Sequence, residues 1–176
     1  MYKKLKDFQK SGIWRGVDGF NSLLVSVAGV CLTAMIFATV VARYVFKRDI
    51  FGSEEIIMFF AWWLYFIGGI GGSQEDSHIK ADMIEVFCSN KFIVDFCRGL
   101  AKALESFVFF LAAYMTYLML QTNFKRWPVT TALKIPYVAT QIPIFIGFIG
   151  MAVFAIYWSL FFFARAFEYK KGGVVE

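Results

Sequence analysis

Residues 56–72 read IIMFFAWWLYFIGGIGG, an apolar run that begins directly after Glu54 and Glu55. Three further apolar stretches cover roughly residues 20–42, 103–120 and 137–163. Helical residues rise about 1.5 Å each, so every stretch, with its flanking turns, can cross a hydrocarbon core about 30 Å thick. Backbone polar groups in lipid must be satisfied within their own segment, so these stretches are expected to be helices.

The composition supports the same conclusion for the whole chain. Of its 176 residues, 59% are hydrophobic and 20% are aromatic, and 22 are phenylalanines. The remaining polar surface is too small to cover a water-soluble globule of this size. We therefore expect one all-α integral membrane domain over residues 1–176, without a soluble domain. Its four transmembrane helices are predicted at about residues 20–43, 54–73, 92–121 and 137–164.

The distribution of cations predicts how the chain is oriented in the membrane. The formal net charge of +5 does not indicate nucleic-acid binding, because the cations lie at the ends of the apolar runs, where lipid headgroups lie. Twelve of the 18 Lys and Arg residues belong to the N-terminal segment, the second connection and the C-terminal segment. The positive-inside rule then puts both termini in the cytoplasm, and the connections 43–55 and 121–136 face outward.

Two segments outside the apolar runs have helical patterns. Residues 1–18 are predicted to form an interfacial amphipathic segment on the inner leaflet, because apolar residues from Tyr2 to Phe8 repeat at helical spacing among lysines. In the second connection, an apolar stripe begins after the capping signal at Asn90 and continues into the third span without a breaker. A helix over residues 90–121 would be about 48 Å long, so we expect its first turns to extend into the cytoplasm.

The outward end of the second span carries three candidate site residues. Glu54 and Glu55 follow Ser53, a possible helix cap, so both carboxylates fall in the first helical turn, where the helix dipole stabilises them. Arg43, at the end of the first span, is close enough in sequence to form an ion pair with either one. Two interpretations stay open: a structural clamp or partner contact, and ion or proton handling, a common task of ionisable groups at membrane depth.

The inner end of the second span carries four more candidates. His78 and Asp82 are four residues apart, so on a helix they share a face and can form a hydrogen bond. The alternative is a metal site, but His78 is the only histidine, which excludes bis-histidine haem ligation, and no convincing zinc-ligand spacing is present. Gly68 and Gly72 form a Gly-x-x-x-Gly pair, which permits close helix packing. We expect neither a metal nor a cofactor.

The chemistry that the chain lacks also bears on its function. No span carries an acid or base near its middle, where coupling-ion machinery would be expected. We also find no nucleophile elbow, phosphate-binding loop or acid paired with a base, so no catalytic residue is predicted and the protein is not expected to be an enzyme. The sequence therefore indicates a partner in a membrane complex.

Several short motifs, taken in their order and spacing, resemble the small membrane subunit, of the DctQ type, of tripartite ATP-independent periplasmic (TRAP) transporters. The resemblance covers nearly the whole chain and rests on these segments: Arg43-Tyr44-Val45-Phe46, Glu54-Glu55, Gly71-Gly72, His78-Ile79-Lys80-Ala81-Asp82, Thr131-Ala132-Leu133-Lys134-Ile135-Pro136 and Ile142-Pro143. It implies a bacterial inner-membrane complex in which a large subunit carries solute and sodium. A periplasmic substrate-binding protein would deliver an acidic solute, such as a sialic acid or a C4-dicarboxylate.

The resemblance also implies roles for this chain and its candidate residues. The small subunit would form a heterodimer with the large TRAP membrane subunit, enlarge its static scaffold and help to dock the binding protein, with membrane lipids around it. Arg43, Glu54 and Glu55 would brace the outer hairpin or contact the binding protein, whereas His78 and Asp82 would order the inner end of the second span. Two other hypotheses stay open: a membrane anchor of a redox enzyme, and a free-standing small transporter.

Overall fold

The computed structural model describes residues 2–9, 11–76 and 90–170, and this part of the chain is almost entirely helical. Its helices are α1 (Tyr2–Gln9), α2 (Gly12–Tyr44), α3 (Ser53–Gln74), α5 (Lys91–Arg126) and α6 (Tyr137–Lys170). Four of them, α2, α3, α5 and α6, are long and apolar enough to cross a membrane. The predicted all-α membrane fold is therefore confirmed, and each of these helices contains one predicted span or overlaps it closely.

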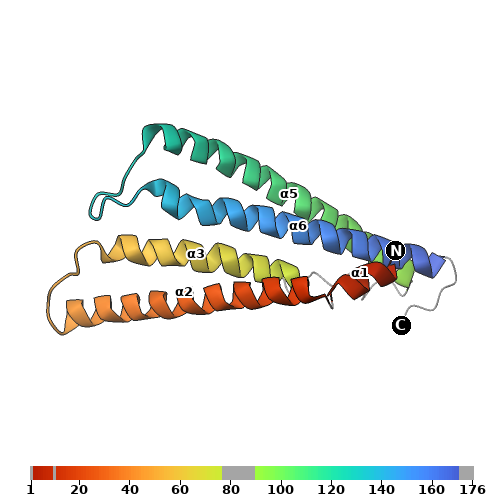
Figure 1. Cartoon of the computed structure of the whole chain (residues 1–176), viewed down its shortest axis with the longest axis horizontal. Coiled ribbons are helices and arrows are strands. Elements are labelled where there is room, and N and C mark those ends of the chain that lie inside the picture. The colour runs from red at the N-terminus through yellow and green to blue at the C-terminus, as the bar shows by residue number, and fades with distance from the viewer. Residues whose placement is uncertain (1, 10, 77–89, 171–176) are drawn as a thin grey trace.

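The four long helices form one open layer instead of a closed bundle (Figure 1). Their order across the layer is α2, α3, α6 and α5, and among these four helices the backbones come close only between neighbours in this order. Helix α2 also reaches α6 at the terminal side of the molecule, where the ring of Trp14 lies 5.3 Å from that of Phe154 and 5.0 Å from that of Tyr157. The layer therefore has two broad faces and two edges, formed by α2 and α5.

The two ends of the layer differ in shape. The helices come together at the end where the first and last described residues lie, and they spread apart at the opposite end, where the α2–α3 and α5–α6 connections lie (Figure 1). We call these the terminal end and the loop end. Two helical hairpins, α2–α3 and α5–α6, thus lie side by side, joined through the contact of α3 with α6.

Glycines on α6 let the two hairpins approach closely. A Cβ atom at Gly147 would lie 2.7 Å from the Cβ of Phe66 on α3, and one at Gly150 would lie 2.8 Å from the side chain of Ile70. A Cβ at Gly68 would meet the side chain of Val25 only at 3.9 Å, an ordinary contact distance. The tightest contact between the hairpins therefore depends on the α6 glycines, which present almost no side-chain volume.

Helix α3 is the shortest of the four long helices and has ionisable residues at both ends. It has 22 residues, a length of about 33 Å, with Glu54 and Glu55 in its first turn and Asp76 just beyond its last residue. Asp76 lies 2.9 Å from the ammonium group of Lys102 on α5. The first three turns of α5 therefore extend past the end of α3, although the side of the membrane on which they lie stays a prediction.

The N-terminal segment is divided between two helices. Helix α1 ends at Gln9, and residues 12–18 already belong to α2. The apolar side of α1 packs on α6: Tyr2 is buried against Phe161, and the hydroxyl of Tyr157 donates to the carbonyl of Leu5 at 2.7 Å. The predicted contact of residues 1–18 with the inner leaflet stays a prediction.

Candidate functional site

The carboxylate of Glu55 joins the two hairpins at the loop end. Glu55 lies in the first turn of α3, and the opposing segment is the α5–α6 loop, residues 127–136. Oε2 accepts from Thr130 Oγ1 at 2.6 Å and from the Leu133 amide at 2.8 Å, and Oε1 accepts from the Ala132 amide at 2.8 Å and from Thr131 Oγ1 at 3.4 Å. Because the acceptor is ionised, the three bonds from Thr130, Ala132 and Leu133, at 2.6–2.8 Å, are strong.

The α5–α6 loop is folded so that its amides point at this carboxylate. Val129 and Pro136 form an isolated antiparallel bridge, and the amide of Thr130 donates to the carbonyl of Ile135 at 2.9 Å. Lys134 has a φ of 58°, in the left-handed region. The resulting turn presents the successive amides of Ala132 and Leu133 as an anion-binding concavity.

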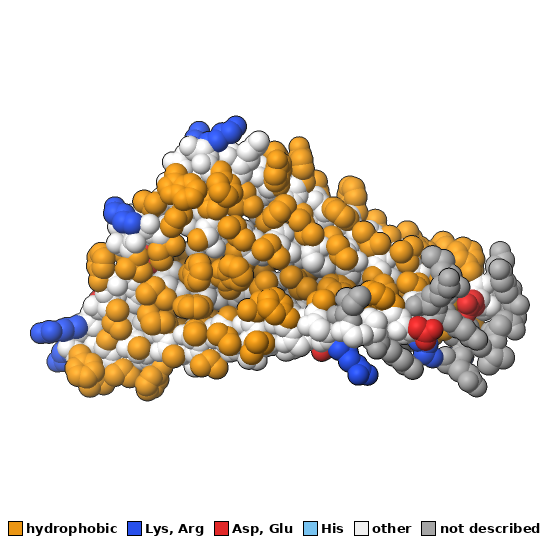
Figure 2. Space-filling model, viewed as in Figure 1, with side chains coloured by type: hydrophobic (Ala, Val, Ile, Leu, Met, Phe, Trp, Pro, Cys, Tyr) orange, Lys and Arg blue, Asp and Glu red, His pale blue; other side chains and the backbone are white. Residues whose placement is uncertain are grey.

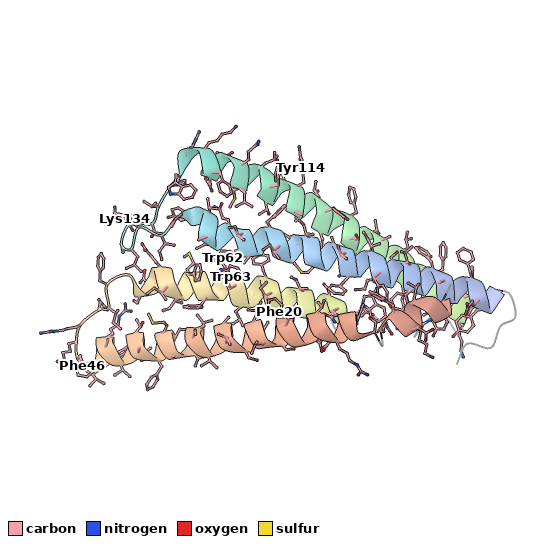
Figure 3. All side chains as sticks on the ribbon, in the orientation of Figure 1. Phe20, Phe46, Trp62, Trp63, Tyr114 and Lys134 are labelled. Atoms are coloured by element: carbon pink, nitrogen blue, oxygen red, sulfur yellow. The ribbon has the colours of Figure 1, made fainter. Side chains whose placement is uncertain are left out.

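This contact matters because the helices diverge at the loop end. In the described part of the chain, no other hydrogen bond joins the α2–α3 hairpin to the α5–α6 loop. Figure 3 shows Lys134 in the α5–α6 loop, close to the point where α3 begins. Glu55 therefore fixes the position of the loop relative to α3.

Arg43 does not take part in this contact. Its Nε lies 2.8 Å from Asp49 Oδ1, within the α2–α3 connection, and both side chains are exposed. The expected ion pair of Arg43 with Glu54 or Glu55 is not formed: the α5–α6 loop occupies both oxygens of Glu55, and Asp49 pairs with the guanidinium instead. Glu54 is exposed beside the loop contact.

A small cavity adjoins the Glu55 contact. It measures about 240 Å³ and lies between α3, the α5–α6 loop and the start of α6. Its lining combines carboxylates, hydroxyls and apolar groups: Glu54, Glu55, Met58, Thr130, Thr131, Ile135, Tyr137 and Thr140. Within the residues that the structure describes, no group of three or more His, Cys, Asp or Glu side chains is placed to hold a metal ion. The carboxylates in this lining suit hydrogen-bond donors.

The terminal end is held by buried polar contacts around the end of α3. Gln74 is almost fully buried, and its amide nitrogen donates to the carbonyl of Trp14 on α2 at 3.0 Å. The indole nitrogen of Trp158 on α6 donates to the carbonyls of Ser73 and Gln74, at 3.1 and 3.2 Å. The last carbonyls of α3, which have no partner within their own helix, are thereby satisfied.

A buried ion pair joins the beginning of α5 to the last turns of α6. Arg165 Nε donates to Asp95 Oδ2 at 2.6 Å, and Nη2 donates to the other oxygen, so the pair is bidentate. The guanidinium also lies over the ring of Phe162, 5.2 Å from its centroid. Bidentate pairing and aromatic stacking both suit arginine better than lysine. Sequence reasoning did not single out Asp95 or Arg165, although each interrupts an apolar stripe.

The remaining predicted site residues do not gather at one place. His78 and Asp82 lie outside the described residues. Gly68 faces α2 at ordinary contact distance, and Gly72 lies in the last turn of α3. Of the predicted residues, Glu55 joins the two hairpins, through its hydrogen bonds to the amides of Ala132 and Leu133. The best-defined site is therefore a structural junction at the loop end.

Comparison with known families identifies the chain. The family model described as the DctQ component of tripartite ATP-independent periplasmic transporters matches residues 32–163. Comparison with curated proteins gives no match. The matched range extends from the middle of α2 to the last turns of α6, so it includes Glu55 and the α5–α6 loop. The chain belongs to the DctQ family and is a multi-pass membrane component of a TRAP transporter.

Proposed function

We propose that this small permease subunit scaffolds the large transport subunit of a sodium-coupled TRAP transporter for an acidic organic solute. Both termini would lie in the cytoplasm, and the loop end would face the periplasm. In this orientation, the subunit helps to dock the periplasmic substrate-binding protein. Family membership supports the transporter assignment, and the open layer of helices supports the scaffold role.

The open layer carries most of this proposal. A solute path through a helical membrane protein has to be surrounded by helices, whereas the four long described helices here lie side by side in a single layer. Of the 18 consecutive residues that make up the most apolar part of α2, only 6% are buried within the chain; the corresponding share for α6 is 33%. Such a layer offers a broad surface to a partner and encloses no path of its own. This favours a subunit that supports transport by another chain.

The polar contacts at both ends of the layer favour a static role for this chain in the complex. The Asp95–Arg165 pair and the Gln74 and Trp158 hydrogen bonds hold the terminal end, and Glu55 holds the loop end. The Trp158 and Glu55 hydrogen bonds join the two hairpins and oppose sliding of one past the other, while the Asp95–Arg165 pair and the Gln74 hydrogen bond hold the helices within each hairpin together. A layer fastened in this way can serve as the fixed support against which a transport domain moves.

Co-purification tests the scaffold role directly. This chain, carrying an affinity tag, is co-expressed with the large permease subunit encoded with it, and the purified material is examined for stoichiometry and for visible absorbance. We expect a one-to-one complex without a haem band. If the chain purifies alone and stable with a haem spectrum, the redox-anchor alternative replaces this proposal; His78 would then be the only histidine able to ligate the iron.

A further inference from the structure

The cavity beside Glu55 lies at the depth of the lipid headgroups. Helix α3 has 22 residues. Its length is about 33 Å, so its first turn reaches the interface when the helix crosses a hydrocarbon core about 30 Å thick. Glu54 and Glu55 belong to that turn, and both line the cavity. This depth is the same for either orientation of the chain in the membrane.

The threonines of the cavity offer acceptors instead of donors. The hydroxyls of Thr130 and Thr131 donate to Glu55, and the hydroxyl of Thr140 donates to the carbonyl of Tyr137 at 2.8 Å. A hydroxyl has a single hydrogen, so each of these three groups can only accept a further hydrogen bond. The lining also contains two carboxylates and neither lysine nor arginine. A ligand that fits this lining has to donate hydrogen bonds.

Glu54 supplies a negative charge that a ligand can reach. Four hydrogen bonds from the α5–α6 loop occupy the carboxylate of Glu55. Glu54 is exposed, and no hydrogen bond or ion pair joins it to another residue that the structure describes. Arg43, a cation on which the charge of Glu54 acts, is already paired with Asp49 at 2.8 Å. A cationic group can therefore bind Glu54 without displacing a partner.

Cations lie around the cavity but do not line it. Lys125, Arg126 and Lys134 are exposed at the end of α5 and in the α5–α6 loop, and Figure 2 shows blue side chains projecting from the loop end. The carboxylates of Glu54 and Glu55 offset part of this positive charge, so the loop end carries separate charges of both signs. A zwitterionic headgroup matches this arrangement: its ammonium group can bind at Glu54, and its phosphate can face the exposed cations.

An apolar track leads from the cavity towards the hydrocarbon core. Met58, which lines the cavity, is 53% exposed, and Trp62, one helical turn further along α3 and labelled in Figure 3, is 37% exposed. The ring of Trp62 stacks on that of Phe66 at 5.7 Å, and Phe66 lies 5.2 Å from Phe148 on α6. An acyl chain can lie along Met58 and Trp62. This favours a lipid over a water-soluble ammonium compound.

We propose that this cavity binds the headgroup of phosphatidylethanolamine, with the ammonium group donating to the Glu54 carboxylate and to the threonine hydroxyls. A primary ammonium group has three N–H donors and a full charge, so its bonds to a carboxylate are charge-assisted. The trimethylammonium group of phosphatidylcholine has no N–H donor, and the headgroup of phosphatidylglycerol has no cation. The site therefore selects among membrane lipids by the chemistry of the headgroup.

The test uses the full-length chain, co-expressed with the large subunit, purified on a tag of its own and held in nanodiscs of phosphatidylcholine. The probe is a trace of photoactivatable phosphatidylethanolamine or, in parallel, phosphatidylcholine, each with its reactive group close to the headgroup. Mass spectrometry then identifies the labelled peptides. The test variant is Glu54→Gln. The matched control is Glu75→Gln, which makes the same change at an exposed carboxylate at the opposite end of α3.

We expect the phosphatidylethanolamine probe to label the peptides that contain Met58 and Tyr137 about tenfold more than the phosphatidylcholine probe does. Glu54→Gln should remove this difference, and Glu75→Gln should preserve it. Glu54→Gln is expected to fold as the wild type does, because Glu54 is exposed and makes none of the hydrogen bonds that hold the loop.

Three results would overturn the inference. The first is equal labelling by the two probes in the wild-type chain, and the second is a preference for phosphatidylethanolamine that survives in Glu54→Gln. The third is competition by soluble phosphoethanolamine, which has no acyl chains, at the same concentration as by the lipid. The ligand would then be a water-soluble ammonium compound.

The design keeps this inference separate from the proposed function. Labelling is measured on peptides of this chain, and the tag is on this chain, so the result does not require the large subunit to co-purify. If the chain purifies alone but labels as expected, the scaffold role fails and the lipid site stands. If the complex forms but the labelling does not depend on Glu54, only the lipid site is wrong.

Discussion

The two ends of the helical layer are held together by different means. At the terminal end, the bidentate Asp95–Arg165 pair, the buried Gln74 and the Trp158 indole join α5, α6, α3 and α2. At the loop end, a single carboxylate, Glu55, holds a loop of another hairpin. Several buried polar contacts hold the terminal end, whereas the hydrogen bonds that hold the loop all converge on one carboxylate. Substitutions can therefore separate the stability of the layer from the geometry of its outer loop.

The largest effect is expected at the terminal end, for Asp95→Ala. This change leaves Arg165 without its partner in a largely buried place, because the Asp95 side chain is only 6% exposed and the Arg165 side chain 23%. Removing one member of a buried pair costs about 3 kcal/mol or more. Thermal unfolding of the purified complex, followed by circular dichroism, measures the loss. An unchanged melting temperature would show that the pair does not hold α5 to α6.

A smaller but clear loss is expected where the two hairpins meet, for Gly147→Ala. The added Cβ would lie 2.7 Å from the Cβ of Phe66 and 3.1 Å from its backbone oxygen, so α3 and α6 would have to move apart. Overpacking of this kind costs about 1–3 kcal/mol. Gly68→Ala is the matched control, because its Cβ would meet Val25 only at an ordinary contact distance of 3.9 Å. If Gly68→Ala is the more damaging change, the result supports the Gly-x-x-x-Gly hypothesis from the sequence.

Glu55→Gln should affect the loop end alone. The neutral amide keeps one acceptor oxygen but loses the charge, so the amides of Ala132 and Leu133 are held less firmly. Hydrogen exchange at these two amides should accelerate about tenfold, while the melting temperature stays close to the wild-type value. Glu54→Gln, at an exposed neighbouring position, is the control. Equal exchange rates in both variants would contradict the role given to Glu55.

The smallest effect is expected for Arg43→Ala. The side chains of Arg43 and Asp49 are 55% and 72% exposed. Exposed ion pairs contribute little to stability because water and salt screen them. Complex yield and melting temperature should both remain at wild-type values. A marked loss of either one would show that Arg43 contacts a partner subunit instead of serving only its own loop.

The sequence predicts the helices better than it predicts their contacts. Apolar runs give the four spans, and Asn90 caps α5 as its position suggests, accepting from the amide of Phe92 at 3.0 Å. The order of helices across the layer does not follow from any local pattern of apolar residues, because such a pattern does not say which helix will be the neighbour. The hydrogen-bond and ion-pair partners of the polar side chains depend on which helices become neighbours, so they could not be predicted from the sequence.

Glu55 shows this limit clearly. Its place in a first helical turn follows from Gly52-Ser53-Glu54-Glu55, but its partners lie 75 to 78 residues away in another hairpin. Arg43 was the nearer candidate in sequence, and the structure pairs it with Asp49. The threonines between Pro128 and Pro136 were the available signal, since a polar turn between two prolines needs an acceptor for its amides.

Uptake of labelled solute into proteoliposomes tests the central claim most directly. The large subunit and the binding protein are reconstituted with and without this chain, and the chain is also reconstituted alone, each with and without a sodium gradient. The scaffold account predicts sodium-dependent uptake only when all three components are present. Full uptake without this chain, or flux through this chain alone, would contradict it.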